Sequence, residues 1–307
     1  MSSNGLITLP DVLLKKHVQN SLFADKKLIA TLHLLKSSLL VSISGALRIY
    51  IAFLLIQAEY IALHCIAGGL IIYSVYTLDR AMGVEEDAVN RTELKGASAR
   101  TALFISLICF IIGALVLATG GLLAIAFLPL VTGYLYTKGL KIGRFKLRLK
   151  GSMGVKNTVV GLSWGAFIAG IAGAYSANLL PTVLVFLFFG TKLFINSTVY
   201  DFRDIKGDFL AGIRTLPVAL GEQNTRRLLF CMHVVSHAAL LFFLLNGVIG
   251  FEPIVLIYSL LAGMITIRNF THQAEVESAS EQTKRLFLVD GESSSIVGLR
   301  TITGLVL

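Results

Sequence analysis

The sequence predicts an all-α integral membrane protein built from about nine transmembrane helices. Composition is the first observation, because 55% of the 307 residues are apolar and only 15% are charged. The second is a mean hydropathy of +0.78, which is far above that of a soluble domain of this length. The third is that the apolar residues gather in long stretches separated by short polar segments.

A helix needs about 20 apolar residues to cross the hydrocarbon core, at a rise of roughly 1.5 Å per residue. Eight stretches reach or nearly reach this length, and a ninth, residues 294–307, is apolar but short. The eight are residues 37–56, 61–78, 101–119, 122–136, 158–175, 179–199, 228–245 and 251–267. We expect a polar N-terminal segment over residues 1–36 and a transmembrane domain over residues 37–307.

The basic residues predict how the chain is oriented, because Lys and Arg in short loops mark the cytoplasmic side. The N-terminal segment and the loops after the second, fourth, sixth and eighth spans carry nearly every Lys and Arg, and the other loops carry none. We therefore assign the N-terminus and these loops to the cytoplasm, with the protein in the cell membrane. This distribution accounts for the net charge of +9 without a nucleic-acid partner.

Two acidic clusters follow apolar spans. Asp201, Asp204 and Asp208 fall on one stripe if the helix continues past the span that ends at residue 199. Asp79 and Asp87 lie eight residues apart after the second span, with Glu86 beside them. Four crossings separate the clusters, so both lie on the cytoplasmic face. Their similar placement, each after a pair of spans, predicts two pseudo-repeated units of a helix pair and an Asp motif.

Carboxylates that face each other repel unless cations lie between them. Oxygen ligands without His or Cys favour Mg²⁺, which binds through a few carboxylates and through substrate phosphate oxygens. We therefore expect Mg²⁺ and a phosphorylated substrate. Basic residues on the same side pair with the remaining phosphate oxygens, namely Lys138, Lys141, Lys156 and Arg214. Asn157, at the mouth of the fifth span, contacts phosphate or starts the helix.

The second acidic cluster resembles a known signature. Asp201, Asp204 and Asp208, followed by AGIRTLP at residues 211–217 and by Gly221, are similar to the second motif of the UbiA superfamily of intramembrane prenyltransferases. The first cluster, with Asp79, Arg80 and DAVN at residues 87–90, is similar to the first motif of that family. The order of spans and motifs also matches, so the resemblance covers nearly the whole chain.

The resemblance implies a nine-helix bundle around a central cavity that opens sideways into lipid. It implies that the two motifs hold Mg²⁺ on the diphosphate of an isoprenyl donor. The metal ligands carried over are Asp79, Asp87, Asp201, Asp204 and Asp208, and all of these except Asp201 are also assigned to catalysis. The residues expected to bind the diphosphate are Arg80, Lys138, Lys141, Lys156, Asn157 and Arg214.

The reaction that the resemblance implies is transfer of an isoprenyl group to a lipophilic or aromatic acceptor within the membrane. Metal and cationic groups stabilise the diphosphate as the allylic bond from C1 to oxygen breaks. The cation that forms needs an apolar, water-poor cavity, which a membrane bundle provides. The expected partners are therefore an isoprenyl diphosphate donor, a hydrophobic acceptor and membrane lipids.

The first motif departs from the family pattern. Val75 and Tyr76 stand where the family has an Asn-Asp pair, and Gly83 stands where it has a carboxylate, so the later acid is Glu86 or Asp87. This leaves open a membrane terpene cyclase or a diphosphate hydrolase of the same fold. An ion-coupled transporter is a further alternative, although its site belongs near the membrane midplane.

Two basic residues fall inside predicted spans. Arg48 lies in the middle of the first and Lys192 in the sixth. A charge in lipid is costly, so both side chains should face the cavity or a partner. For Lys192 a second interpretation is that its long side chain reaches the membrane surface.

Overall fold

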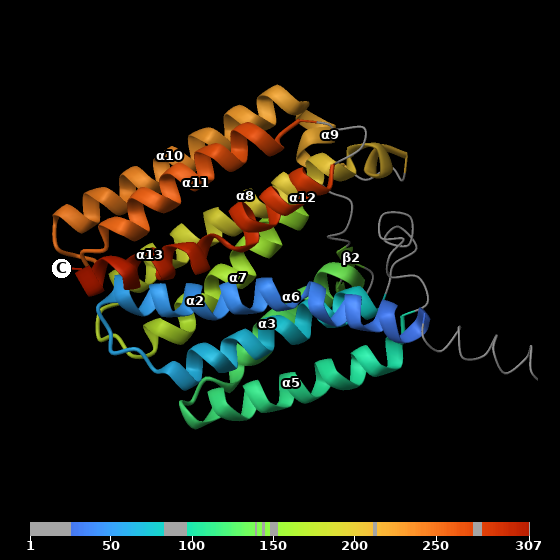
Figure 1. The fold of residues 1–307 in the computed structure, drawn as a ribbon, viewed down its shortest axis with the longest axis horizontal. Coiled ribbons are helices and arrows are strands. Elements are labelled where there is room, and N and C mark those ends of the chain that lie inside the picture. Colours follow the sequence, from blue (N-terminus) through green and yellow to red (C-terminus); the bar gives the residue numbers. More distant parts are fainter. Residues whose placement is uncertain are drawn as a thin grey trace, which may run out of the picture.

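The computed structural model describes residues 26–82, 97–138, 140–142, 145–147, 153–210, 214–272 and 278–306. Figure 1 shows the described elements as a bundle of helices. They are α2 (Leu39–Ile56), α3 (Ala62–Met82), α5 (Ala99–Thr119), α6 (Leu123–Lys138), β1 (Leu140–Ile142), β2 (Phe145–Leu147), α7 (Val155–Gly173), α8 (Leu179–Leu210), α9 (Leu216–Leu220), α10 (Glu222–Leu245), α11 (Pro253–Phe270), α12 (Ala279–Arg285), the π-helical turn η2 (Leu286–Asp290) and α13 (Glu292–Val306).

Each of the nine predicted stretches lies largely within a helix, which confirms the helical interpretation of the apolar sequence. Among the described residues, seven helices are long and apolar enough to cross a membrane. The first of these runs from Lys26 to Ile56 and so begins before α2. Helix α6 is apolar but shorter, and α13 has 15 residues. The protein is therefore an integral membrane protein with seven candidate spans in its described part.

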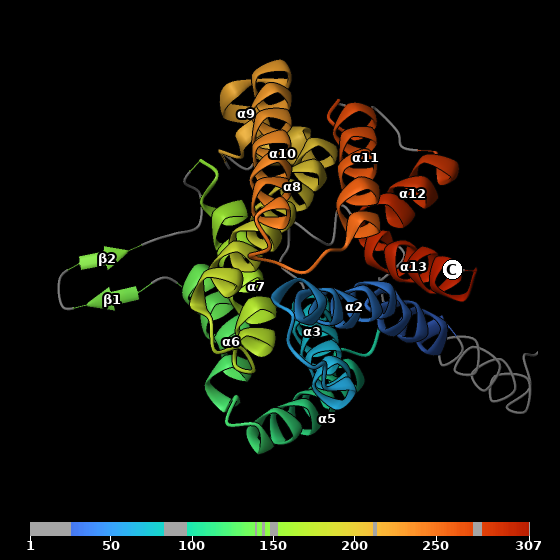
Figure 2. The same ribbon diagram turned by 90° about the vertical axis from the view of Figure 1, so that its left-hand side faces the viewer.

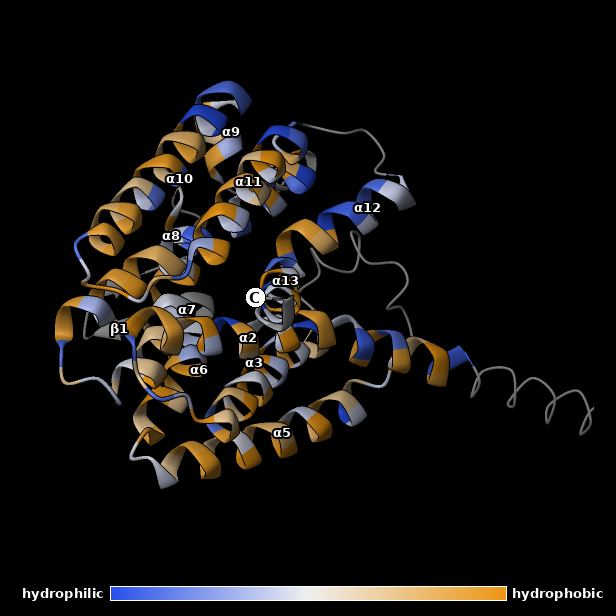
Figure 3. Ribbon diagram, turned by 60° about the vertical axis from the view of Figure 1, so that its left-hand side comes forward, coloured by the Kyte–Doolittle hydropathy of each residue, from blue (hydrophilic) through white to orange (hydrophobic). Residues whose placement is uncertain are grey.

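The outer surface of the bundle is apolar, as the orange outward faces of α5 and α10 show in Figure 3. On α5, the side chains of Phe104, Leu107, Ile111 and Leu115 are all exposed. A continuous apolar surface of this kind is unfavourable in water and suits contact with lipid tails. The polar residues described below lie inside the bundle or near its ends.

Helix α8 continues well past the predicted span. Its 32 residues correspond to about 48 Å at the usual helical rise, whereas the hydrocarbon core is about 30 Å thick. The acidic stripe that begins at Asp201 is therefore on a continuous helix, as the sequence predicted. The C-terminal ends of α3 and α8 lie at the same end of the bundle (Figure 1). Both acidic motifs are thus directed to one end.

A small hairpin is the one departure from an all-helical fold in the described part. β1 and β2 pair antiparallel, with Lys141 opposite Lys146. The hairpin lies between α6 and α7 and projects from the bundle (Figure 2). Its sequence alternates basic and apolar residues, a period that favours a strand over a helix.

The backbones of α7 and α8 approach closely through glycine. A Cβ atom on Gly165 would lie 2.8 Å from the Cα of Gly190, and one on Gly161 would lie 2.6 Å from the carbonyl oxygen of Gly190. Small residues allow membrane helices to pack at this distance. This contact fixes the start of α7 beside the acidic end of α8.

Candidate active site

Asp201 is the buried centre of the second motif, with no exposed surface. One of its carboxylate oxygens accepts a hydrogen bond from Lys156 Nζ at 2.8 Å, and the other accepts one from Asn157 Nδ2 at 2.7 Å. Asn157 is also fully buried and donates to Ser197 Oγ at 3.2 Å. The first turn of α7 is therefore held to α8 by hydrogen bonds to both oxygens of this carboxylate.

Asp204 has a more open position, one turn further along α8. Its side chain is partly exposed and accepts two hydrogen bonds from the guanidinium of the adjacent Arg203, at 2.9 and 3.2 Å. The backbone of Asp208 continues the same helix, but its side chain lies outside the described residues. Asp204 thus presents a carboxylate at the bundle end, where a ligand can reach it.

The first motif begins at the last turn of α3. Asp79 is exposed there, while Arg80 donates to Ser38 Oγ at 2.5 Å and places its guanidinium 5.7 Å from the centre of the Tyr76 ring. Glu86 and Asp87 both lie outside the described residues. Asp79 and Arg80 therefore lie in the last turn of α3, whose C-terminal end is at the same end of the bundle as that of α8 (Figure 1).

The predicted phosphate-binding residues come from several elements. Lys156 and Asn157 both contact Asp201, and the side chain of Lys156 is half exposed. Arg214 is exposed just before α9. Lys138 is the last residue of α6 and Lys141 lies on β1, and the side chains of both are outside the described residues.

Sequence reasoning missed a second polar group beside the motif. Tyr200 donates to Asp290 Oδ2 at 2.5 Å, and the Arg285 guanidinium lies 5.0 Å from the centre of the Tyr200 ring. Asp290 lies in η2, outside the seven candidate spans. Burial raises the pKa of Asp290, whereas the Tyr200 hydrogen bond and the charges of Arg48, Arg80 and Arg285 lower it. Asp290 follows apolar residues and precedes Gly291 and Glu292, and this short acidic pair does not have the spacing of the two motifs, so its role was not indicated.

Lys192 does not reach the membrane surface, so that interpretation is wrong. Its ammonium is buried and lies 2.6 Å from a carboxylate oxygen of Glu292 on α13 and 2.9 Å from Ser259 Oγ on α11. The expectation that Lys192 and Arg48 face inward is confirmed, because both are 7% exposed. A partner on another helix stabilises the ammonium more than lipid could.

The oxygen donors at this end fit Mg²⁺. Within the described part of the chain, no three His, Cys, Asp or Glu side chains lie close enough together to form a metal site. Mg²⁺ needs fewer than three protein ligands, because one or two carboxylates together with water and substrate phosphates complete its coordination. Asp79 and Asp204 are accessible carboxylates at the bundle end, and Asp201 becomes available only if Lys156 or Asn157 releases an oxygen.

The protein is an integral membrane protein made of apolar helices. Two of these helices, α3 and α8, carry acidic residues where they end, and these residues form a polar site at one end of the bundle. The model of the UbiA prenyltransferase family matches residues 36–289, and the chain belongs to that family.

Three known proteins illustrate the relationship. A digeranylgeranylglyceryl phosphate synthase of Sulfolobus acidocaldarius is 32% identical over 169 residues, which are 52% of this chain and 54% of that protein. A digeranylgeranylglyceryl phosphate synthase of Sulfurisphaera tokodaii is 29% identical over 228 residues, which are 70% of this chain and 74% of that protein. The chain thus spans about half the length of the first relative and three quarters of the second. A UbiA homologue of Archaeoglobus fulgidus bound to DMAPP and Mg²⁺ shares the fold, with a TM-score of 0.57, 16% identity, and coverage of 87% of this chain and 99% of that one.

Proposed function

We propose that this protein transfers an isoprenyl group from a polyprenyl diphosphate to a lipophilic acceptor within the membrane, in a reaction that depends on Mg²⁺. The observation that carries the proposal is the continuous α8 helix, which places Asp201 beside the start of α7 and Asp204 one turn further on, at the end of the candidate span Leu179–Ile205. Family membership and the sequence of the second motif support it. The apolar isoprenyl chain of the donor can be buried among apolar helices, whereas its charged diphosphate cannot. A polar site at the end of the bundle therefore suits both the chain and the diphosphate.

The donor diphosphate is held at this end by carboxylates through Mg²⁺ and by cations directly. Asp79, Asp87, Asp204 and Asp208 are the proposed metal ligands, with Asp201 a further ligand if it exchanges a hydrogen bond. Bound Mg²⁺ neutralises the diphosphate and so makes it a better leaving group. The cations and amide that contact phosphate oxygens are Arg80, Lys138, Lys141, Lys156, Asn157 and Arg214.

The bundle next to this site excludes water from the allylic cation. Tyr76 stacks on Trp164 with 5.7 Å between ring centroids, and Trp164 packs edge-on against Phe167 at 5.6 Å. Aromatic faces attract a cation, and apolar walls keep out the water that would convert it to an alcohol. These side chains lie on α3 and α7, the helices whose ends carry the first motif and the partners of Asp201.

We further propose that the site opens on the cytoplasmic face of the cell membrane, because the basic loops lie at this end. The relatives are named for a product that contains a glyceryl phosphate. A glycerophosphate lipid that carries one isoprenoid chain is therefore the first acceptor to test.

The test is release of diphosphate by the purified protein, with donor and acceptor, before and after removal of Mg²⁺ by a chelator. Asp204→Ala should lower the rate at least about 100-fold, since it removes a group that acts on the transition state. Glu252→Ala is the control, because Glu252 pairs with Arg300 away from the motif. Full activity in Asp204→Ala, or activity unaffected by the chelator, contradicts the proposal.

The same assay separates the alternatives. Diphosphate release that requires an acceptor indicates transfer, whereas equal release without one indicates a cyclase or a hydrolase. A transporter would release none.

A further inference from the structure

The hairpin of β1 and β2 has two chemically different faces. Its register pairs Lys141 with Lys146 at the centre of the two strands. Residues that pair across an antiparallel ladder lie on the same face, and successive residues along a strand lie on opposite faces. The two lysines therefore share one face. The residues on the other face are all apolar, namely Leu140, Ile142, Phe145 and Leu147.

The hairpin belongs to the end of the bundle that carries the second acidic motif. It connects α6 to α7, whose first turn contacts Asp201 through Lys156 and Asn157. Figure 2 shows β1 and β2 projecting sideways, away from the helices, and in Figure 1 they lie beside the helices rather than beyond their ends. Since the helices cross the membrane, a sideways projection at this end runs along the membrane surface.

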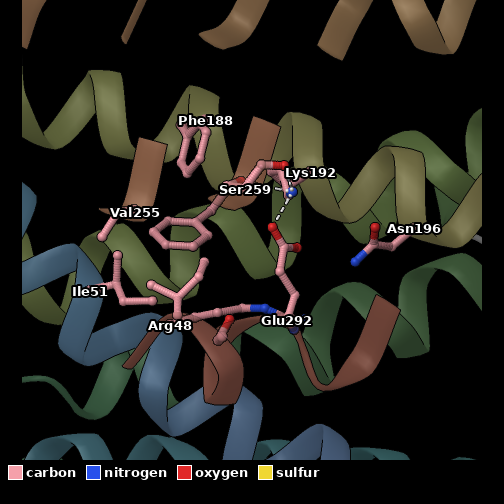
Figure 4. Close-up of a pocket in the computed structure, with 11 residues that line it drawn as sticks. Arg48, Ile51, Phe188, Lys192, Asn196, Val255, Ser259 and Glu292 are labelled. Carbon is pink, nitrogen blue, oxygen red and sulfur yellow. Dashed lines mark hydrogen bonds and ion pairs between the residues drawn. The ribbon is translucent and has the colours of Figure 1, made fainter. Parts of the chain in front are cut away.

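The hairpin needs a partner outside the described bundle. In the described part of the chain, β1 and β2 have extensive contacts with each other and with no helix. A two-stranded hairpin alone is marginally stable in water, and like charges directly opposite each other across strands are unfavourable. Lys192, by contrast, is matched inside the bundle by Glu292 at 2.6 Å (Figure 4). A suitable partner for the hairpin has both an apolar layer and negative charge.

We propose that the hairpin binds the anionic surface of the surrounding membrane, with its apolar face in the lipid and its lysine face among the headgroup phosphates. A lipid surface provides the apolar layer and the negative charge together. Basic clusters that directly follow a membrane helix are typical of segments that bind anionic lipids. Residues 138–150 contain no Asp or Glu and six basic residues, which are Lys138, Lys141, Arg144, Lys146, Arg148 and Lys150.

The experiment measures contact between the hairpin and lipid without donor or acceptor, so it does not depend on the proposed function. The native cysteines are replaced in the full-length protein, and Phe145→Cys is labelled with a fluorophore. The protein is reconstituted in vesicles of phosphatidylcholine, with or without about 30% phosphatidylglycerol, that contain a lipid with a quencher near its headgroup. Quenching should be at least about 3-fold stronger in the anionic vesicles. About 1 M salt should remove the difference, because it shortens the screening length to about 3 Å.

Lys146→Glu separates lipid binding from the folding of the hairpin. It places opposite charges at the central pair with Lys141, which favours the pairing of the strands, and it weakens the attraction to anionic headgroups. The increase in quenching by phosphatidylglycerol should therefore be lost. Arg227→Gln is the matched control, because Arg227 is an exposed basic residue on α10, outside the hairpin. This variant should keep the increase.

Equal quenching in neutral and anionic vesicles, or an unchanged increase in Lys146→Glu, overturns the inference. Quenching in neutral vesicles that rises with the amount of protein per vesicle would assign the apolar face to a second copy of the chain and also overturn it.

The donor is a competing partner for the lysine face, because Lys141 is also a proposed ligand of its diphosphate. An isoprenyl diphosphate and Mg²⁺ are therefore added to the anionic vesicles. If they reverse the quenching as high salt does, the lysine face binds the donor rather than lipid and the inference is wrong. Quenching that is unchanged by the donor supports a hairpin bound to the membrane surface.

Discussion

Asp201 and Asp204 are three residues apart on one helix, yet their carboxylates have different surroundings. Asp201 is fully buried and accepts hydrogen bonds from Lys156 and Asn157, whereas Asp204 is partly exposed and pairs with Arg203. A buried amide that loses its acceptor costs about 1–3 kcal/mol, and an exposed ion pair contributes less than about 1 kcal/mol. The two residues should therefore respond differently to substitution.

We predict that Asp201→Ala lowers the unfolding temperature and the turnover together, because it leaves the Asn157 amide buried without its carboxylate acceptor. Asp204→Ala should stop turnover with the unfolding temperature almost unchanged. Thermal unfolding in detergent and diphosphate release measure the two effects. The reverse pattern, a stable Asp201→Ala and an unstable Asp204→Ala, would contradict these assignments.

A second residue-level prediction concerns the first motif, where the sequence leaves Glu86 and Asp87 as alternatives. The resemblance of DAVN at residues 87–90 to the family's first motif assigns the second ligand to Asp87. A regular helix would instead favour Glu86, which would lie about 20° from Asp79 around the axis, with Asp87 about 80° away. We predict from the motif that Asp87→Ala raises the Mg²⁺ concentration needed for turnover and that Glu86→Ala does less. Gly83→Asp should recover part of the activity of Asp87→Ala. If Glu86→Ala has the larger effect, the assignment of the ligand to Asp87 is wrong.

Single residues could be predicted only where a motif marked them. Lys156 and Asn157 were predicted as phosphate-binding side chains, but their bonds to Asp201 join residues 45 and 44 positions apart. Glu292 and Asp290 belong to no spaced acidic pattern, so their partners Lys192 and Tyr200 could not be inferred from sequence. These contacts depend on which helices pack together, and apolar composition alone does not determine that.

At the scale of elements, the contact of α7 with α8 controls the position of the site. Gly165→Ala should force the two backbones apart, because its Cβ would meet the Gly190 Cα at 2.8 Å. We expect a loss of about 1–3 kcal/mol in unfolding free energy and a lower turnover, since Asn157 moves away from Asp201. Gly298→Ala is the matched control, with no atom within 4 Å of the new Cβ.

Gly298→Ala should stabilise the protein slightly, by up to about 1 kcal/mol, because alanine favours a helix more than glycine does. Thermal unfolding of both variants checks the pair. If Gly165→Ala and Gly298→Ala unfold at the same temperature, α7 and α8 can move apart without a loss of stability, and the prediction is wrong.

Helix positions were predicted well because apolar stretches are long and uninterrupted. Helix ends were predicted less well, since α8 runs to Leu210 and α10 begins at Glu222, both within polar sequence. A membrane-spanning pattern ends where apolar residues end, but the helix itself continues while its backbone hydrogen bonds are satisfied.

For the whole molecule, the distribution of Lys and Arg predicts that both acidic motifs face the cytoplasm. Cysteines introduced at residues 83 and 207 should react alike with a thiol reagent that cannot cross the membrane. The native Cys65, Cys109 and Cys231 are replaced first, because Cys231 is exposed. If one introduced cysteine reacts only from outside and the other only from inside, the predicted topology is wrong.

The central claim is isoprenyl transfer, and the mass of the product tests it most directly. Purified protein is incubated with Mg²⁺, a deuterated isoprenyl diphosphate and a glycerophosphate lipid that carries one isoprenoid chain, and the lipids are analysed by mass spectrometry. We predict a product whose mass equals that of the two substrates less diphosphoric acid, with all of the deuterium retained. A free isoprenyl alcohol or a cyclised hydrocarbon as the sole deuterated product would contradict the claim.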